Sequence, residues 1–454
     1  MPSNVLIIVI DSLRSDKLFG TEKTAKTPIF DNLIKNGFFF PNTISSSDGT
    51  VISWASMFTS LEPLKTGVGS DQYNKIDSSI LNYFSLIKNE GFNVYGCVPK
   101  FANAFGMMKD FQNNDKTYDH FQGLSDGLGT KIISQLKSNL MKEPWIYFIH
   151  INDIHFPVIP PKSFDFQKFG ESKYDRTISS IDLWLGKILE SVDLKNTLVV
   201  ITADHGAYVP SVKINNQWIN YETDGVKQKL TTKVGNKIPS FLDPIKSKLF
   251  FKVETFRKQI KQKKSQQFLL TAYQKRSLFS QRGDLDHFLF DERIRVPLVF
   301  FGNGINSTKI FNSQVRTIDI FPTIFDILGL KSYENTVDGI SLIPIMKGES
   351  SNELPALIIS SPLLEINSND VIGIRTSQYK YFRDKDNPNN RVYLFNLLDD
   401  PLEEKNISKE NPKIIQEFET IIAKKQPKLK QNNSEYDEEE LKNIEKELKK
   451  MGYI

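Results

Sequence analysis

Acidic and imidazole side chains directly follow two apolar runs of this sequence. Asp11 comes after residues 5–10 (VLIIVI), and residues 202–206 (TADHG) place Asp204 and His205 just beyond another run. In an open α/β sheet, ligands bind beyond the carboxyl ends of buried parallel strands. Two carboxylates and an imidazole at that edge can bind a divalent metal ion. Each acid alone is more typical of a helix cap or a loop.

The chain has only five histidines, which makes their positions informative. Besides His205, residues 148–157 (FIHINDIHFP) contain His150 and His155, and His287 lies further along the chain. A histidine beside a reacting ester can act as a general acid or bind an anionic group. His150 falls inside an apolar run and is interpreted as structural.

Strands and helices alternate along the first three quarters of the chain. This order is typical of a mostly parallel sheet with helices on both faces, so we expect an α/β fold. Apolar residues return every three or four positions from Ile178 to Ile188, which predicts a helix. A second helix is expected between Asp319 and Gly329. Buried strands are predicted at residues 5–10, 94–98, 145–151, 198–201 and 296–301.

The pattern changes after about residue 345. Short strands separated by a turn-rich segment predict a small antiparallel sheet at residues 372–375, 379–383 and 392–395. Charge-rich residues 437–450 space their apolar positions as a helix does. We therefore expect a catalytic domain at residues 1–345, with a basic insertion at about 207–285, and a C-terminal subdomain at residues 346–454.

Composition excludes several classes of protein. With 39% hydrophobic and 25% charged residues, the 454-residue chain is neither disordered nor fibrous. Its one cysteine, Cys97, can form no internal disulfide and is expected to be a buried thiol. No apolar run is long enough for a signal peptide or a membrane span, so we expect a cytoplasmic protein with peripheral membrane contact left open.

Six blocks, in order along nearly the whole chain, resemble sulfatases of the alkaline phosphatase superfamily. Two of them, residues 4–14 and 202–206, resemble the first strand and the second metal motif of that family. The others are residues 53–60 (SWASMFTS), 292–298 (ERIRVPL), 315–323 (VRTIDIFPT) and 448–454 (LKKMGYI). The resemblance implies a sulfatase-like fold, with a mostly parallel central sheet flanked by helices and a small C-terminal antiparallel sheet.

The nucleophile position departs from that family. Sulfatases carry a Cys or Ser that is oxidised to formylglycine, followed two residues later by Pro and four residues later by Arg. Matching Ala55, Ser56 and Thr59 to the family pattern puts Thr50 at the nucleophile and Trp54 at the arginine. Threonine cannot become formylglycine, and a threonine sulfate ester must be attacked at sulfur. Threonine nucleophiles occur in phosphodiester-cleaving members of the superfamily, so phosphoryl chemistry is favoured.

The resemblance implies a metal site made by Asp11, Thr50, Asp204 and His205, with His155 and His287 binding substrate or protonating the leaving group. Many sulfatases have a second acid after the first, but here Ser12 follows Asp11. Mixed oxygen and nitrogen ligands favour zinc or manganese over calcium or magnesium. The remaining alternatives are a sulfatase proper, a phosphoethanolamine- or glycerophosphate-type transferase, and an inactive binding homologue.

Residues 207–285 hold sixteen Lys and Arg but five Asp and Glu, while the net charge of the whole chain is +4. Such a segment is more often a solvated face than a binding surface. Within it, residues 249–260 (LFFKVETFRKQI) could form a helix that binds an anionic surface. The expected partner is an anionic ester substrate, with a glycan or lipid head group as candidates. No nucleic acid is expected, because no recognised binding motif accompanies the basic residues.

Overall fold

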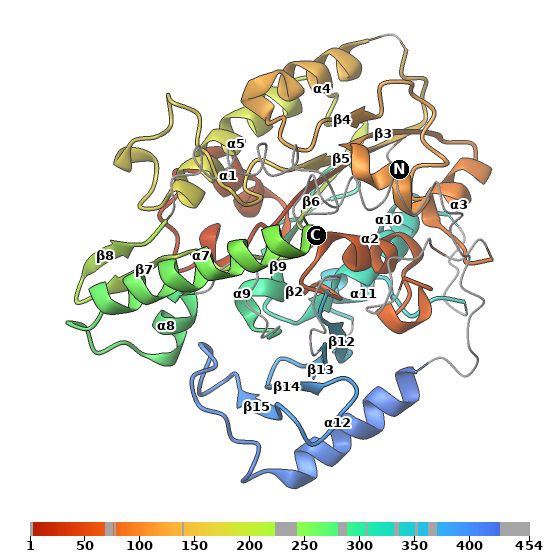
Figure 1. Ribbon diagram of the computed structural model, residues 1–454. Helices are drawn as coiled ribbons and strands as arrows, with labels where there is room; N and C mark the ends of the chain where they lie inside the picture. The colour runs from red at the N-terminus through yellow and green to blue at the C-terminus, as the bar shows by residue number, and fades with distance from the viewer. Residues whose placement is uncertain are drawn as a thin grey trace.

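The fold is known from a computed structural model, shown in Figure 1. The structure describes residues 3–68, 76, 79–138, 140–222, 243–279, 288–305, 307–330, 336–349, 353–361 and 370–426. The predicted helix at residues 437–450 and His287 lie outside these residues. No helix within the described ranges is long and apolar enough to cross a bilayer.

A nine-stranded sheet forms the centre of the molecule, in the order β10-β2-β9-β6-β1-β5-β3-β4, with β11 paired to β2. Pairing is parallel except where β9 meets β6 and β2. The mostly parallel α/β sheet expected from the sequence is thus confirmed. The strands are β1 Asn4–Ile10, β2 Phe38–Ile44, β3 Asn93–Pro99, β4 Thr117–Tyr118, β5 Trp145–Ile151, β6 Thr197–Thr202, β9 Arg295–Gly302, β10 Lys309–Ile310 and β11 Val315–Arg316.

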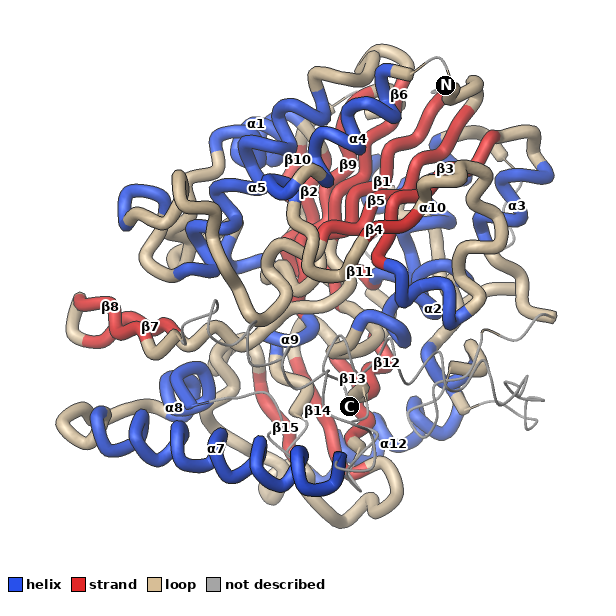
Figure 2. Tube along the Cα trace, turned by 45° about the horizontal axis from the view of Figure 1, so that its top comes forward, coloured by secondary structure: helices blue, strands red, loops and turns tan. Residues whose placement is uncertain are grey.

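Helices cover both faces of this sheet because its central strands are apolar on both sides. Val5, Ile7 and Val9 of β1 belong to the cluster that contains α2, α3 and α10, while the alternate residues of β1 face α1, α4 and α5. Figure 2 shows these two layers on opposite sides of the strands. The helices are α1 Pro28–Asn36, α2 Thr50–Thr59, α3 Tyr83–Asn89, α4 Leu128–Lys137, α5 Lys173–Leu189 and α10 Ile320–Ile327.

The predicted C-terminal antiparallel sheet is also present. It has four strands, in the order β12-β13-β14-β15, and the sequence analysis missed β12. The strands are β12 Ala356–Ile359, β13 Val371–Arg375, β14 Tyr379–Asp384 and β15 Tyr393–Asn396. Helix α12 (Pro412–Lys425) packs on this sheet, and α11 (Ile343–Lys347) precedes it.

Buried charges join this small sheet to α9 (Asp291–Ile294). Lys380 of β14 is fully buried, and its Nζ lies 2.5 Å from Asp291 Oδ1 and 2.7 Å from Glu403 Oε1. Arg375 of β13 donates to Asp291 Oδ2 at 3.0 Å. The pairing with Arg375 and Lys380 outweighs burial and lowers the pKa of Asp291.

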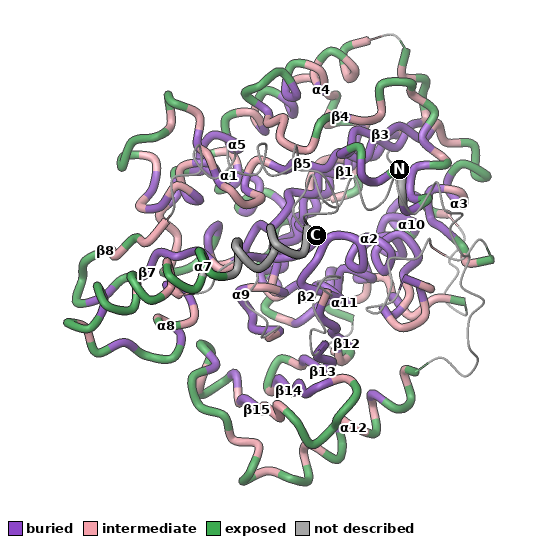
Figure 3. The backbone as a smooth tube through the Cα atoms, viewed as in Figure 1, coloured by how far each residue is buried: buried purple, intermediate pink, exposed green. Residues whose placement is uncertain are grey.

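The basic segment forms a hairpin and two helices in its described part. These are β7 (Ser211–Ile214), β8 (Gln217–Asn220), α7 (Asp243–Lys264) and α8 (Ala272–Phe279). A small apolar cluster that includes Val212 and Leu278 holds the hairpin against α8. The described side chains of α7 are mostly exposed, as Figure 3 shows. The predicted helix at residues 249–260 is confirmed and is longer than expected.

Candidate active site

The central strands place Asp11, Asp204 and His205 together. Asp11 follows β1, and Asp204 and His205 follow β6, which is the parallel neighbour of β1. One ligand atom from each of these three buried residues lies within 4.8 Å of the other two. The sequence correctly placed these residues at a shared edge of the sheet.

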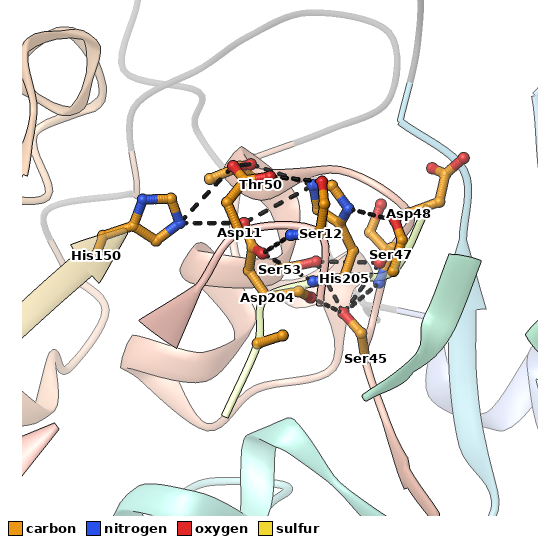
Figure 4. A network of polar contacts seen from close by, with 12 residues as sticks. Asp11, Ser12, Ser45, Ser47, Asp48, Thr50, Ser53, His150, Asp204 and His205 are labelled. Carbon is orange, nitrogen blue, oxygen red and sulfur yellow. Dashed lines mark hydrogen bonds and ion pairs between the residues drawn. The ribbon is translucent and has the colours of Figure 1, made fainter. Parts of the chain in front are cut away.

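Local hydrogen bonds hold the other polar atom of each of these three side chains, so that Asp11 Oδ2, Asp204 Oδ2 and His205 Nε2 face the centre of the group (Figure 4). Ser12 Oγ donates to Asp11 Oδ1 at 2.5 Å, while the backbone N–H of His205 donates to Asp204 Oδ1 at 2.9 Å. His205 Nδ1 lies 2.8 Å from the carbonyl oxygen of Gly206. This contact fixes the proton on Nδ1 and leaves the lone pair of Nε2 for a metal ion.

The electrostatics of this group fit a divalent cation. Burial raises the pKa of Asp11, and the charge of Asp204 raises it further because the two carboxylates repel each other. Burial alone would raise the pKa of Asp204, but His205 and His150 lower it. The pKa of His205 is raised because Asp204 and Asp11 outweigh its burial. A bound cation would remove the repulsion between the carboxylates, so the donor set fits a metal ion.

Thr50 is the first residue of α2, and its hydroxyl reaches the same group. Thr50 Oγ1 lies 3.4 Å from Asp11 Oδ2 and 3.3 Å from His205 Nε2. The amino end of a ten-residue helix favours negative charge, which suits an anionic group next to Thr50. The side chain is almost fully buried.

Ser53 is the nearest alternative nucleophile in sequence, but its hydroxyl has other contacts. Ser53 Oγ donates to the carbonyl oxygen of Ser47 at 3.1 Å and lies 2.9 Å from Ser45 Oγ. Ser45 Oγ in turn contacts the carbonyl oxygen of Asp204. The serines therefore support the loop before α2 and the end of β6, whereas Thr50 faces Asp11 and His205.

The other predicted residues are placed differently. His155 lies in the turn after β5, where its ring packs 4.9 Å from that of His120. Trp54, which the resemblance matches to the family arginine, packs against aromatic rings that include Phe148.

Two residues that the sequence analysis did not select also belong to this region. His150 Nε2 lies 3.4 Å from Asp204 Oδ2, although His150 was interpreted as structural. Arg293 donates to Asp48 Oδ2 at 2.8 Å, and Asp48 lies two residues before Thr50. The register of β5 against β1, which pairs Val9 with His150, was the missing signal for His150.

Comparison with known proteins agrees with the predicted resemblance. The family pattern described as Sulfatase matches residues 3–330, and that of N-sulphoglucosamine sulphohydrolase, C-terminal, matches residues 281–435. Arylsulfatase K of Mus musculus is 23% identical over 487 residues, which cover 96% of this chain and 82% of that protein. N-acetylglucosamine-6-sulfatase of Homo sapiens is 40% identical over 63 residues, or 14% of this chain and 11% of that protein.

Solved structures share the fold. Ps i-CgsB in complex with k-i-k-neocarrahexaose has a TM-score of 0.63 and 17% identity, with 100% of both chains covered. The phosphonate monoester hydrolase of Agrobacterium radiobacter has a TM-score of 0.59 and 14% identity, with 93% of this chain and 95% of that chain covered.

Proposed function

This chain belongs to the sulfatase family, and from that premise we propose that it cleaves a phosphate or sulfate ester through a covalent intermediate on Thr50. The observation that carries this proposal is the position of Thr50 Oγ1, 3.4 Å from Asp11 Oδ2 and 3.3 Å from His205 Nε2. We favour phosphoryl transfer, because a threonine ester lacks the aldehyde route by which formylglycine releases sulfate.

Sulfatases are metal-dependent hydrolases, and Asp11, Thr50, Asp204 and His205 would hold the ion here, with zinc or manganese as the candidates. When bound, the ion supplies positive charge that favours the ionised Thr50 hydroxyl and polarises the ester. Ser12 and the backbone N–H of His205 keep the two carboxylates oriented toward the site. The nearly complete burial of these groups keeps competing water away.

The first step forms a bond between Thr50 Oγ1 and phosphorus and breaks the bond to the leaving oxygen. The Thr50 hydroxyl donates toward Asp11 Oδ2, which takes its proton. His155 and His287 are the candidates to bind the transferred group and protonate the leaving oxygen. A water, or an acceptor hydroxyl in a transferase, then attacks phosphorus and gives its proton to the histidine that protonated the leaving oxygen. The bond from phosphorus to Thr50 Oγ1 breaks, and Thr50 takes its proton back from Asp11.

The proposed substrate is an anionic ester on a glycan or a lipid head group. The lysine group of α7, defined as Lys258, Lys261, Lys263 and Lys264, provides positive charge within the basic segment. Ps i-CgsB, which shares the fold, was crystallised with a carrageenan oligosaccharide. That precedent supports a glycan as one substrate class to test.

A sulfatase proper is the second candidate, because the named relatives are an arylsulfatase and an N-acetylglucosamine-6-sulfatase. Assays with an aryl sulfate, a phosphate monoester, a phosphate diester and a phosphonate, each with zinc, manganese, calcium or magnesium, separate the two candidates. Bound metal without turnover of any ester would indicate an inactive binding homologue.

Trapping the covalent intermediate tests the nucleophile directly. We expect mass spectrometry to find the transferred group on Thr50. Thr50→Val, which keeps the branched shape but removes the hydroxyl, should abolish labelling and turnover, and Thr50→Ser should retain both in part. A label on Ser53 or Ser56 would overturn the assignment.

A further inference from the structure

His150 directs an imidazole nitrogen at the metal-binding carboxylates from the side opposite His205. It is the penultimate residue of β5 and is fully buried. Its Nε2 lies 3.4 Å from Asp204 Oδ2 and 3.8 Å from Asp11 Oδ2. Figure 4 shows the two imidazoles on either side of the carboxylates. His150 therefore faces the same two carboxylate oxygens as Thr50 and His205 do.

These distances resemble those between ligands of one metal ion. Two atoms that each lie about 2.1 Å from a zinc ion are about 3.4 Å apart at tetrahedral angles and about 4.2 Å apart on opposite sides of the ion. Thr50 Oγ1 lies 3.4 Å from Asp11 Oδ2, and His205 Nε2 lies 3.7 Å from Asp204 Oδ2. The contacts of His150 Nε2, at 3.4 and 3.8 Å, fall in the same range.

The surroundings of His150 hold its ring in this orientation. The ring of Trp54 packs edge-on against it, with centroids 4.6 Å apart and an interplanar angle of 81°. The hydroxyl of Tyr118 donates to the carbonyl oxygen of His150 at 2.8 Å, which anchors the backbone. Trp54 thus occupies the position of the family arginine and supports a nitrogen ligand beside it.

A purely structural role explains His150 poorly. Within the described part of the chain, His150 Nδ1 is buried without a hydrogen-bond partner. An unsatisfied buried polar atom costs about 1–3 kcal/mol, so an interaction at Nε2 must offset that cost. A metal bond at Nε2 would do so, whereas the long contact to Asp204 would offset little.

We propose that His150 Nε2 is a further protein ligand of the metal ion, which compensates for the carboxylate that Ser12 does not provide. The ion would then have two carboxylate oxygens and two imidazole nitrogens, besides the Thr50 hydroxyl. Such a donor set suits zinc and disfavours calcium, which prefers six to eight oxygen ligands. This inference rests on the proposed metal-dependent function but makes a separate claim about the ligands.

X-ray absorption spectroscopy of the zinc-loaded full chain tests whether His150 binds the ion, because multiple scattering shows how many imidazoles are coordinated. We expect two imidazoles in the wild type and one in His150→Gln. Zinc affinity should fall by more than about tenfold in that variant, as for loss of a direct ligand. The control is His120→Gln, which changes a histidine ring that packs against Phe101, a neighbour of Trp54, and should retain both coordinated imidazoles.

The number of coordinated imidazoles in the wild type decides the test even if His150→Gln fails to fold. Zinc bound through a single imidazole in the wild type would overturn this inference and leave the proposed function intact. Failure of the wild type to bind zinc or any other divalent ion would instead overturn the proposed function. Unchanged zinc affinity in a folded His150→Gln variant would also contradict the assignment.

Discussion

Asp153 should make the folded protein less stable as the pH rises from 4 to 8. Its carboxylate accepts hydrogen bonds from the backbone N–H of Leu124 at 3.0 and 3.1 Å, beside Gly123. Burial raises the pKa of Asp153 from 3.8 to about 7, and the hydrogen bonds from Leu124 only partly oppose this effect. The folded protein therefore holds this proton more tightly than the unfolded chain does.

Proton linkage gives the direction in which the free energy of unfolding changes with pH. Below pH 3.8 the side chain is protonated in both states and contributes no pH dependence. Between pH 3.8 and about 7 the unfolded chain loses the proton while the folded protein keeps it, so the free energy of unfolding falls as the pH rises. A difference of about three pKa units corresponds to about 4 kcal/mol. Asp153 is partly exposed, so this value is an upper limit.

Asp153→Asn keeps the acceptor oxygen and removes the ionisation. We expect its free energy of unfolding, relative to the wild type, to rise by about 1–4 kcal/mol between pH 4 and pH 8. Urea unfolding with a chelator present measures this difference without contributions from bound metal. Asp193→Asn is the control, because Asp193 is exposed and also accepts a backbone hydrogen bond, from Lys195 at 3.0 Å. If the difference in free energy of unfolding between Asp153→Asn and the wild type stays constant from pH 4 to pH 8, the buried carboxylate does not cause the pH dependence.

Other substitutions test the site and the substrate. His205→Ala should weaken zinc binding more than about tenfold by equilibrium dialysis, since it removes a direct ligand; unchanged affinity would remove that role. Gly206→Ala should lower the free energy of unfolding in urea by about 1–3 kcal/mol, because an added Cβ would lie 2.3 Å from the carbonyl oxygen of Glu292; a wild-type value would contradict this clash. His287→Ala should keep its metal content but slow esters with poor leaving groups by about 10²- to 10⁴-fold, and equal losses across leaving groups would argue against a general acid. Changing the lysine group of α7 to glutamine should slow hydrolysis of large anionic substrates but not of small aryl esters, because only the large substrates would reach these charges. If both substrate classes respond equally at low and high salt, these lysines have no electrostatic role in substrate choice.

The sequence predicted most of the central sheet, because its strands are continuous apolar runs with polar residues at their carboxyl ends. It missed β2, whose segment contains Pro41 and Asn42. The register against β9 shifts between Phe40 and Thr43, so the proline lies where the ladder is interrupted. A proline interrupts the apolar run by which a short strand is predicted, so β2 was not predicted.

The candidate site was predicted in part, because three of its residues directly follow apolar strands. Asp11, Asp204 and His205 follow strands that are neighbours in the sheet, which made their proximity predictable. The placement of Thr50 required the resemblance to sulfatases, since nothing in a Ser- and Thr-rich segment identifies one hydroxyl. The sequence does not show where the imidazole of His150 lies, because a fully buried strand is apolar on both faces; the sheet register places it beside Asp204.

The buried charges beneath the small sheet make the two sheets dependent on each other for folding. Separating the two sheets would part Asp291 from both Lys380 and Arg375, while Lys380 would keep Glu403, which belongs to the same C-terminal part of the chain. Breaking a buried pair in this way typically costs about 3–5 kcal/mol, a large share of the stability of a domain. The C-terminal sheet is therefore a poor module for exchange between relatives, since a chimera would have to carry Asp291 and Glu403 together with Lys380.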